Sequence, residues 1–178
     1  MDTIKVLDKE FKLLLSEKQI RENVKKVAGK INKDLAGKNP LFLAVLNGAF
    51  MFASDLMKNI NIPSEISFVK LASYQGMQSN GKVREVFGLS ERIDGRTVVI
   101  IEDIVDSGLT MQQLLSSLST RNPAEIRIAT LLLKPESLKC ELNLDYVVFE
   151  IPDEFVVGFG LDYDGYGRNM PEVYTLVK

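Results

Sequence analysis

The hydrophobic pattern of residues 16–36 predicts an amphipathic helix. Apolar side chains recur there at intervals of three or four, which places them on one face of a helix. Ser16 and Gln19 have the spacing of a capping box, which satisfies free amides at the first helical turn. Gly37 follows the last apolar position and supplies the predicted end of the helix.

Short apolar runs predict buried strands, because each run is too short for a buried helix. These runs cover residues 41–46, 64–73, 97–102, 126–133, 145–150 and 173–177. Helices are predicted between them, from an Asn-Gly turn after residue 46 to residue 59 and over 110–119. This alternation predicts an α/β fold with a mainly parallel central sheet flanked by helices, whose ligands bind beyond the carboxyl ends of the strands. Residues 73–82 are polar, contain glycine and follow no clear period, so they predict a mobile loop.

Composition and charge exclude several classes of function. With 178 residues, 46% of them apolar, the chain can bury the core of one domain. The formal net charge of −2 provides no positive field for nucleic acid, which is therefore not an expected partner. No apolar run approaches the roughly 18 residues that a membrane span needs, and the first residues lack a signal-peptide core. A cytoplasmic location without a membrane partner is predicted.

The chain contains no histidine, which restricts the chemistry open to it. Acid–base catalysis near neutral pH then depends on carboxylates, lysine, tyrosine or the single cysteine, Cys140. One cysteine cannot form an intrachain disulfide. A bound metal ion is expected to be a hard one held by oxygen ligands.

The stretch VVIIEDIVDSGLTM, residues 98–111, joins a buried strand to a helix through acids, a glycine and hydroxyl residues. Amides at a helix N-terminus attract anions, and the serine and threonine hydroxyls add donors for a phosphate. Glu102, Asp103 and Asp106 would repel a phosphate unless they face another part of the same ligand. A ribose 5-phosphate fits both groups of residues, with its phosphate at the helix N-terminus and its hydroxyls at the carboxylates.

The same residues also have ordinary structural explanations. Asp106 before a Ser-Gly pair is equally explained as the cap of the following helix. Glu102 and Asp103 at a strand end could be two solvated acids. Residues 140–167 contain acids and no lysine or arginine, so this region could face a cation, a bound metal or water.

Three stretches resemble the purine phosphoribosyltransferases, in particular their 6-oxopurine (hypoxanthine-guanine) branch. They are residues 45–52 (VLNGAFMF), 98–110 (VVIIEDIVDSGLT) and 139–171, and their order and spacing also match. The resemblance implies the type I phosphoribosyltransferase fold, with a small hood subdomain, in one domain over residues 1–178. It implies purine salvage, in which the phosphoribosyl group of 5-phosphoribosyl 1-diphosphate moves to N9 of hypoxanthine or guanine with Mg²⁺ as cofactor. A homodimer or homotetramer is also implied.

The resemblance assigns roles to individual residues of the 98–110 stretch. Glu102 and Asp103 would bind the ribose hydroxyls, directly or through magnesium. Asp106 would face purine N7 as the proton acceptor. The positions that would hold the 5-phosphate are Ser107, Gly108, Leu109 and Thr110.

Further positions would bind the base and the diphosphate. Lys134 would donate to the oxygen at purine C6, Phe155 would stack on the purine, and the Val156 backbone would meet its Watson–Crick edge. Asp162 would bind a second magnesium through water. The diphosphate-binding positions are Leu46, Asn47, Gly48 and Arg168, and those of a closing loop are Ser73 and Tyr74. Without the resemblance, Lys134 is explained as a solvated lysine at a strand end, and Asp162 and Arg168 as surface loop residues.

The diphosphate turn departs from the family at one position. Several family members carry lysine where this chain has Asn47, so a side-chain charge is missing and only backbone contact is expected. The family's turn contains a non-proline cis peptide, which the resemblance places between Leu46 and Asn47.

Two other functions remain open. The domain could be an effector sensor, as in repressors that kept a phosphoribosyltransferase domain, although the chain shows no DNA-binding segment and no basic RNA-binding face. A receiver-like or hydrolase α/β domain could use the strand-end acids for magnesium and phosphoryl transfer. That interpretation predicts an aspartyl-phosphate, and it leaves Lys134 and the stretch FEIPDEFVVGFGLDY unexplained.

Overall fold

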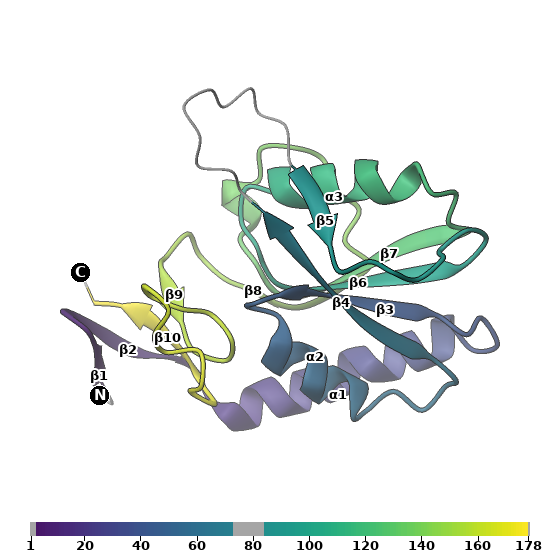
Figure 1. Cartoon of the computed structure of the whole chain (residues 1–178). Helices are drawn as coiled ribbons and strands as arrows, with labels where there is room; N and C mark the ends of the chain where they lie inside the picture. The colour runs from purple at the N-terminus through teal and green to yellow at the C-terminus, as the bar shows by residue number, and fades with distance from the viewer. Residues whose placement is uncertain (1–2, 73–83, 178) are drawn as a thin grey trace.

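The chain folds into a large, mainly parallel sheet and a small antiparallel one, as a computed structural model shows (Figure 1). Residues 3–72 and 84–177 are described. The predicted loop at 73–82, with Ser73 and Tyr74, lies outside the described residues.

The larger sheet forms the centre of the molecule, and its strand order is β5-β4-β3-β6-β7-β8. Its strands are β3 (Leu41–Leu46), β4 (Glu65–Ala72), β5 (Arg84–Phe87), β6 (Thr97–Val105), β7 (Glu125–Leu133) and β8 (Tyr146–Glu150). Neighbouring strands are parallel, except that β5 runs antiparallel to β4. The predicted parallel sheet is confirmed, and β5 is an addition that the apolar pattern did not indicate.

Strand β6 continues beyond its predicted end at residue 102. Its last residues still pair with β7, and Val105 lies opposite Leu133. The prediction stopped early because Glu102 and Asp103 interrupt the apolar run, whereas backbone pairing continues through them. The two acids therefore belong to the strand itself, and the ladder fixes the direction in which each carboxylate points.

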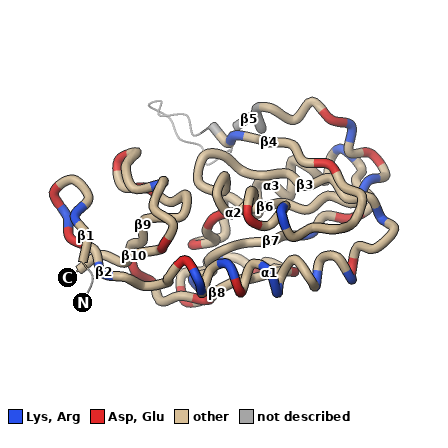
Figure 2. Tube along the Cα trace, turned by 90° about the horizontal axis from the view of Figure 1, so that it is seen from below, with Lys and Arg blue, Asp and Glu red and all other residues tan. Residues whose placement is uncertain are grey.

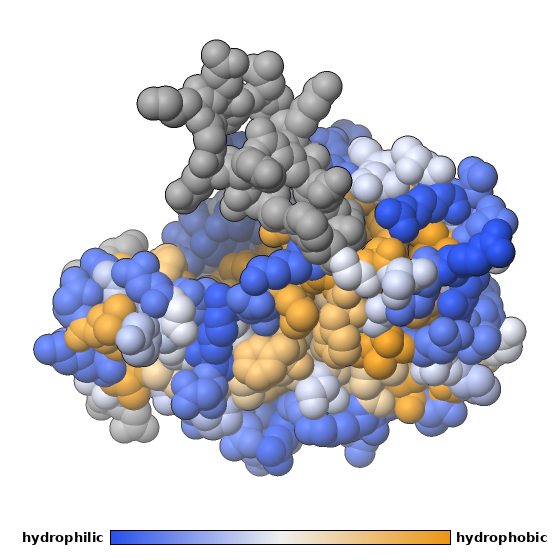
Figure 3. Space-filling model, in the orientation of Figure 1, coloured by the Kyte–Doolittle hydropathy of each residue, from blue (hydrophilic) through white to orange (hydrophobic). Residues whose placement is uncertain are grey.

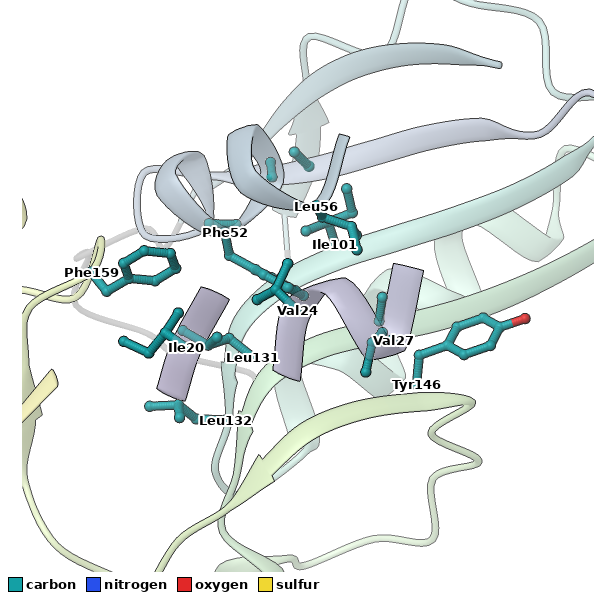
Figure 4. Packing of buried hydrophobic residues seen from close by; sticks show 14 of the residues in the cluster. Ile20, Val24, Val27, Phe52, Leu56, Ile101, Leu131, Leu132, Tyr146 and Phe159 are labelled. Atoms are coloured by element: carbon teal, nitrogen blue, oxygen red, sulfur yellow. The ribbon is translucent and has the colours of Figure 1, made fainter. Parts of the chain in front are cut away.

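Helices cover both faces of the larger sheet, as predicted (Figure 1). Helices α1 (Glu17–Asp34) and α2 (Phe50–Met57) lie on one face, and α3 (Leu109–Ser119) lies on the other. Figure 4 shows apolar side chains of α1, α2 and β6 gathered on the first face: Ile20, Val24, Val27, Phe52, Leu56 and Ile101. The short 3₁₀ helix η1 (Pro135–Ser137) follows β7.

The start of α1 has the predicted capping box. The Oγ of Ser16 accepts from the Gln19 amide at 3.3 Å, and the Ser16 amide donates to Oε1 of Gln19 at 3.0 Å. The helix ends at Asp34, slightly before the predicted end, and Gly37 follows with a φ of 77°. Figure 2 shows basic residues at intervals along α1. Across residues 3–72 and 84–177, no helix is both long and apolar enough to cross a membrane.

The smaller sheet forms a hood at one end of the larger sheet and contains both ends of the described chain (Figure 1). Its strand order is β1-β2-β10-β9, with antiparallel pairs. Its strands are β1 (Thr3–Val6), β2 (Lys9–Leu15), β9 (Val156–Val157) and β10 (Val173–Leu176). The hood is confirmed, but β10 was predicted as a further strand of the alternating pattern. Strand β10 instead belongs to the smaller sheet, where it pairs with β2 and β9.

The hairpin of β1 and β2 was not predicted from the sequence. Charged residues surround Phe11, and Leu13, which is 41% exposed, breaks a simple alternation of buried and exposed positions. Only a few side chains are buried here, and Phe11 packs with Val6 and Val157 in a small core within the hood. Such a short strand pair gives a weak sequence signal.

Candidate active site

Three connections converge at the carboxyl edge of the larger sheet. They follow β3, β6 and β7, and the parallel strand direction brings Leu46, Asp106 and Lys134 to the same edge. Strands β3 and β6 are neighbours. The chain continues from β3 to β4, toward one edge of the sheet, and from β6 to β7, toward the other edge. Such a switch point opens a crevice for a ligand. Figure 3 shows the hood as a separate lobe, with a hollow between it and the body.

The turn after β3 packs directly against the end of β6. The peptide between Leu46 and Asn47 is cis, as the resemblance implied. A Cβ at Gly48 would overlap the Asp103 carboxylate, so a larger residue here would force the carboxylate or the turn to move. A Cβ at Gly160, where φ is 103°, would overlap the Gly48 carbonyl oxygen. The hood, the turn after β3 and the strand-end acid Asp103 therefore meet in close contact.

Glu102 and Asp103 form a crowded pair of carboxylates. Burial, and then the charge of Asp103, raises the pKa of Glu102 well above its ordinary value. The Oδ1 of Asp103 accepts from the Ile104 amide at 2.9 Å. A nearby cation would relieve this repulsion, and carboxylate oxygens suit a hard ion such as Mg²⁺. Within the described residues, no group of three acidic or cysteine side chains forms a complete metal site. A bound ion would therefore need further ligands from substrate or water.

The turn from β6 into α3 forms a candidate phosphate site. Gly108, with a φ of 79°, is the N-cap of α3, and as a glycine it has no side chain with which to cap the helix. The Oγ of Ser107 accepts from the Leu109 amide at 3.4 Å. A cavity of about 100 Å³ is lined by Glu102, Ile104, Val105, Asp106, Ser107, Gly108, Thr110 and Met111. The explanation of Asp106 as the helix cap is therefore wrong, and the site has the chemistry of an anion-binding helix N-terminus.

A second cavity, of about 220 Å³, adjoins the first one. It is lined by Asp103, Ile104, Asp106, Lys134, Phe155, Val156, Leu161 and Asp162. Asp106 borders both cavities. Side chains from β6, from the end of β7 and from the hood thus surround one hollow, and they include all three positions that the resemblance assigned to the purine.

Lys134 is buried and paired with two carboxylates. Its Nζ lies 2.9 Å from Oδ2 of Asp106 and 3.2 Å from Oδ1 of Asp153. Burial disfavours its charge, but the hydrogen bonds to both carboxylates outweigh burial and raise the pKa of Lys134. The hydrogen bond from Lys134 is also the main cause that lowers the pKa of Asp153. The explanation of Lys134 as a solvated strand-end lysine is wrong, because only 7% of the residue is exposed.

Asp162 and Arg168 form an ion pair in the hood. The Nη2 of Arg168 lies 2.7 Å from Oδ1 of Asp162, and its Nη1 donates to the Gly160 carbonyl at 2.7 Å. The Gly165 amide donates to Oδ2 of Asp162 at 2.7 Å. Both side chains are partly buried and fixed by these contacts, which a freely solvated loop residue would not be. Asp162 also lines the second cavity.

Several residues around the site were missed by sequence reasoning. Asp153 was not singled out, although it holds Lys134. The acidic composition of residues 140–167 was a usable signal, because Asp153 and Asp162 both pair with cations. Phe11 also escaped notice, since nothing in the N-terminal sequence indicated that its ring would lie 6.2 Å from the Phe155 ring.

Comparison with known proteins decides the family. A profile of the phosphoribosyl transferase domain matches residues 12–164. The chain belongs to the phosphoribosyltransferase family. The matched range includes the site residues from Leu46 to Asp162, whereas Arg168 lies beyond it. Membership of this family removes the receiver-like and hydrolase interpretations.

Individual phosphoribosyltransferases are similar over almost the whole chain. The hypoxanthine-guanine phosphoribosyltransferase of Streptococcus thermophilus (strain CNRZ 1066) is 40% identical over 173 residues, which are 96% of this chain and 96% of that one. The Streptococcus mutans enzyme of the same name is 42% identical over 166 residues, 93% of this chain and 92% of its own. A solved structure, the hypoxanthine phosphoribosyltransferase of Staphylococcus aureus, has a TM-score of 0.87 at 38% identity and covers 93% of this chain and 91% of that chain. The type I phosphoribosyltransferase fold is confirmed.

Proposed function

We propose that the protein is a purine salvage enzyme that transfers the phosphoribosyl group of 5-phosphoribosyl 1-diphosphate to N9 of hypoxanthine or guanine. The products are IMP or GMP and diphosphate. The observation that carries this proposal is the pair of adjoining cavities that share Asp106. One has the chemistry of a phosphate site, and the other has a buried lysine and an aromatic face for a 6-oxopurine. The relatives named above support the choice of base.

The ribose phosphate occupies the first cavity in this proposal. The turn formed by Ser107, Gly108, Leu109 and Thr110 holds the 5-phosphate, because the start of α3 provides amides and hydroxyls. Glu102 and Asp103 face the ribose hydroxyls. As the bond from C1 to diphosphate breaks, positive charge develops on the sugar, and these carboxylates stabilise it.

The purine occupies the second cavity. Lys134 donates to the oxygen at C6, Phe155 stacks on the ring, and the Val156 backbone meets the Watson–Crick edge. Purine N9 forms the new bond to C1 while the diphosphate leaves with the electrons of its bond to C1. The proton on N7 moves to Asp106, the carboxylate that already lies beside Lys134.

Magnesium fits the acidic side chains of the site. Glu102, Asp103 and Asp162 offer hard oxygen donors, and the repulsion between the first two favours a cation beside them. We propose that these residues hold Mg²⁺ together with substrate oxygens. When bound, the ion neutralises negative charge on the diphosphate leaving group.

The diphosphate is held by backbone and arginine in this proposal. The turn of Leu46, Asn47 and Gly48 provides backbone contacts at the switch point, without the lysine that several family members carry there. Arg168 supplies a positive charge from the hood, where Asp162 now holds it. The guanidinium has five N–H donors, so Arg168 can contact the diphosphate without leaving Asp162.

A direct assay tests the proposed function. The protein is incubated with phosphoribosyl diphosphate, Mg²⁺ and either hypoxanthine, guanine or adenine, and nucleotide formation is followed by absorbance and chromatography. We expect IMP and GMP but little AMP. An effector-sensing domain would bind phosphoribosyl diphosphate in calorimetry without forming nucleotide, and that result would reject the enzymatic proposal.

We also propose that the protein forms a homodimer or homotetramer. Ile66 and Phe68 are alternate residues of β4, so they point to the same face, and they are 39% and 46% exposed. A second copy of the chain would remove this apolar surface from water. Sedimentation equilibrium tests the proposal, and a monomer at all concentrations would reject it.

A further inference from the structure

Two aromatic rings near the C-terminal end of the chain, Phe155 and Tyr163, cluster with the N-terminal Phe11 beside the second cavity. The Phe155 ring lies 6.2 Å from the Phe11 ring and 5.9 Å from the Tyr163 ring, and Phe11 and Tyr163 are 6.3 Å apart. Phe155 and Tyr163 meet edge to face, with an angle of 83° between their planes. Edge-to-face and tilted pairs at such distances are favourable, so each supporting ring stabilises one orientation of Phe155.

The backbone and the ring of Phe155 are held by different elements. Strand β10 holds the backbone, since the Phe155 carbonyl accepts from the Leu176 amide at 3.0 Å and from the Thr175 hydroxyl at 3.3 Å. The ring depends on Phe11, which is fully buried, and on Tyr163. Phe155 itself is 46% exposed and lines the cavity. A half-exposed ring without such support would sample other rotamers.

Tyr163 is in turn fixed by the turn between β1 and β2. Its hydroxyl donates to Oδ1 of Asp8 at 2.9 Å, and Nζ of Lys9 lies 5.6 Å from the centre of its ring. The hydrogen bond lowers the pKa of Asp8 and raises the pKa of Tyr163, so the Tyr163 hydroxyl remains a donor at neutral pH. Through Asp8 and Tyr163, the N-terminal hairpin is thus connected to Phe155, which lines the second cavity.

We propose that Tyr163 and Phe11 are positioning residues for the purine, which orient the Phe155 ring for stacking, and that Asp8 anchors Tyr163 for this purpose. The inference rests on the proposed function, because it deepens the purine site of that reaction. The N-terminal hairpin, which is far from the acidic motif in sequence, then contributes to affinity for the base. It contributes nothing direct to binding of phosphoribosyl diphosphate.

A purely structural role for the cluster predicts a different result. Phe11 belongs to the small core of the hood, so loosening this core would disturb the whole hood. The hood also carries Asp162 and Arg168, which are proposed to serve the diphosphate. A structural role therefore changes the KM values of both substrates together, whereas ring orientation changes the KM of the purine alone.

The experiment compares four single variants with the parent protein. Tyr163→Leu removes the ring, Tyr163→Phe keeps the ring and removes the anchor, and Asp8→Ala removes the acceptor. Tyr166→Leu is the matched control, because Tyr166 is three residues away in the same hood segment and 62% exposed. Steady-state kinetics gives the KM for hypoxanthine and for phosphoribosyl diphosphate, and thermal unfolding gives the stability of each variant.

For Tyr163→Leu we expect the KM for hypoxanthine to rise by about threefold to tenfold, the range that loss of one aromatic pair supports. The KM for phosphoribosyl diphosphate should not change in Tyr163→Leu, and neither KM should change in the control Tyr166→Leu. Tyr163→Phe and Asp8→Ala should each raise the KM for hypoxanthine by less. The double variant Tyr163→Phe/Asp8→Ala should show no larger rise than either single variant, because both substitutions remove the same hydrogen bond. If Tyr163→Leu does not fold, the comparison of Tyr163→Phe, Asp8→Ala and their double variant decides whether the anchored Tyr163 ring contributes to the KM for hypoxanthine.

Two results overturn the inference while leaving the proposed function intact. One is a parallel rise of both KM values in the Tyr163 and Asp8 variants. The other is an unchanged KM for hypoxanthine in all of them. By contrast, a folded parent protein that forms no nucleotide from either hypoxanthine or guanine would reject the proposed function itself.

Discussion

The ammonium of Lys134 lies 2.9 Å from the carboxylate of Asp106, and this contact joins the ends of β7 and β6. The lysine is buried and the aspartate is about half exposed toward the two cavities. A buried ammonium and a half-exposed carboxylate are thus placed side by side. Their spacing suits a 6-oxopurine, whose C6 oxygen and N7 are neighbouring groups on the same edge of the base.

Asp106→Asn should impair chemistry more than binding. Asparagine keeps the shape and the oxygen that accepts from Lys134, but it cannot take a proton from N7. We expect kcat for hypoxanthine to fall by about 100-fold, the usual value of general-base help, with unchanged binding of phosphoribosyl diphosphate. Single-turnover nucleotide formation and calorimetry on the same protein measure both effects, and Asp55→Asn on α2 is the control. A variant that lost binding but kept its chemical rate would show that Asp106 has a structural role.

Lys134→Ala should weaken the use of 6-oxopurines. The C6 oxygen loses a charged, desolvated donor, which corresponds to roughly 1.5–3 kcal/mol in kcat/KM. Adenine should be a poor substrate of the parent protein, because its amino group presents hydrogens to the ammonium. Competition between hypoxanthine and adenine measures this preference, with Lys139→Ala as an exposed-lysine control. Equal use of the two bases by the parent protein would contradict the assignment of the base pocket.

The pH dependence should reveal the second partner of Lys134. Its pKa is raised, so the ammonium is present at neutral pH and is lost only as pH rises through that raised pKa. Asp153→Asn removes one of the two carboxylates that raise it, so the alkaline loss of kcat/KM for hypoxanthine should begin at a lower pH. Glu154→Gln is the matched control, because Glu154 accepts from Thr175. Identical alkaline limbs in the parent and Asp153→Asn would show that Asp153 does not support the charge of Lys134.

The secondary-structure elements that depend on a single run of residues were predictable from the sequence. The buried strands and the capping box at Ser16 depend on neighbours in sequence, and both are present. The acidic stretch also identified the carboxyl edge of the sheet, because parallel strands end there together. The pairing of Lys134 with Asp153 was not predictable, since it depends on how β7 and β8 lie side by side.

The hood was harder to predict from residue patterns than the sheet. Strands β1, β9 and β10 are two to four residues long, and β2 pairs with β10 from the opposite end of the chain. The resemblance implied a hood but did not indicate that an N-terminal side chain would pack against Phe155, which lines the second cavity. Phe11 acquires its position only when β2 pairs with β10, so no local pattern could reveal it.

Metal removal should abolish turnover. The proposed ligands are carboxylates together with substrate oxygens, which favour Mg²⁺ or Mn²⁺ over zinc. Activity should disappear in excess EDTA, return with Mg²⁺ or Mn²⁺, and tolerate a chelator selective for zinc. Calorimetry should also show tighter binding of phosphoribosyl diphosphate when Mg²⁺ is added. Full turnover in excess EDTA would remove magnesium from the proposal.

Gly48→Ala should damage the proposed diphosphate site, because the added methyl group would overlap the Asp103 carboxylate and displace the turn or the carboxylate. Overpacking of this kind costs about 1–3 kcal/mol, and the displaced turn should also raise the KM for phosphoribosyl diphosphate more than that for hypoxanthine. The control is Gly29→Ala in α1, where an added Cβ meets no atom within 4 Å and alanine favours the helix. Thermal unfolding and steady-state kinetics of both variants make the comparison. Parent-like stability and KM in Gly48→Ala would mean that the close contact between this turn and Asp103 is not needed for the site.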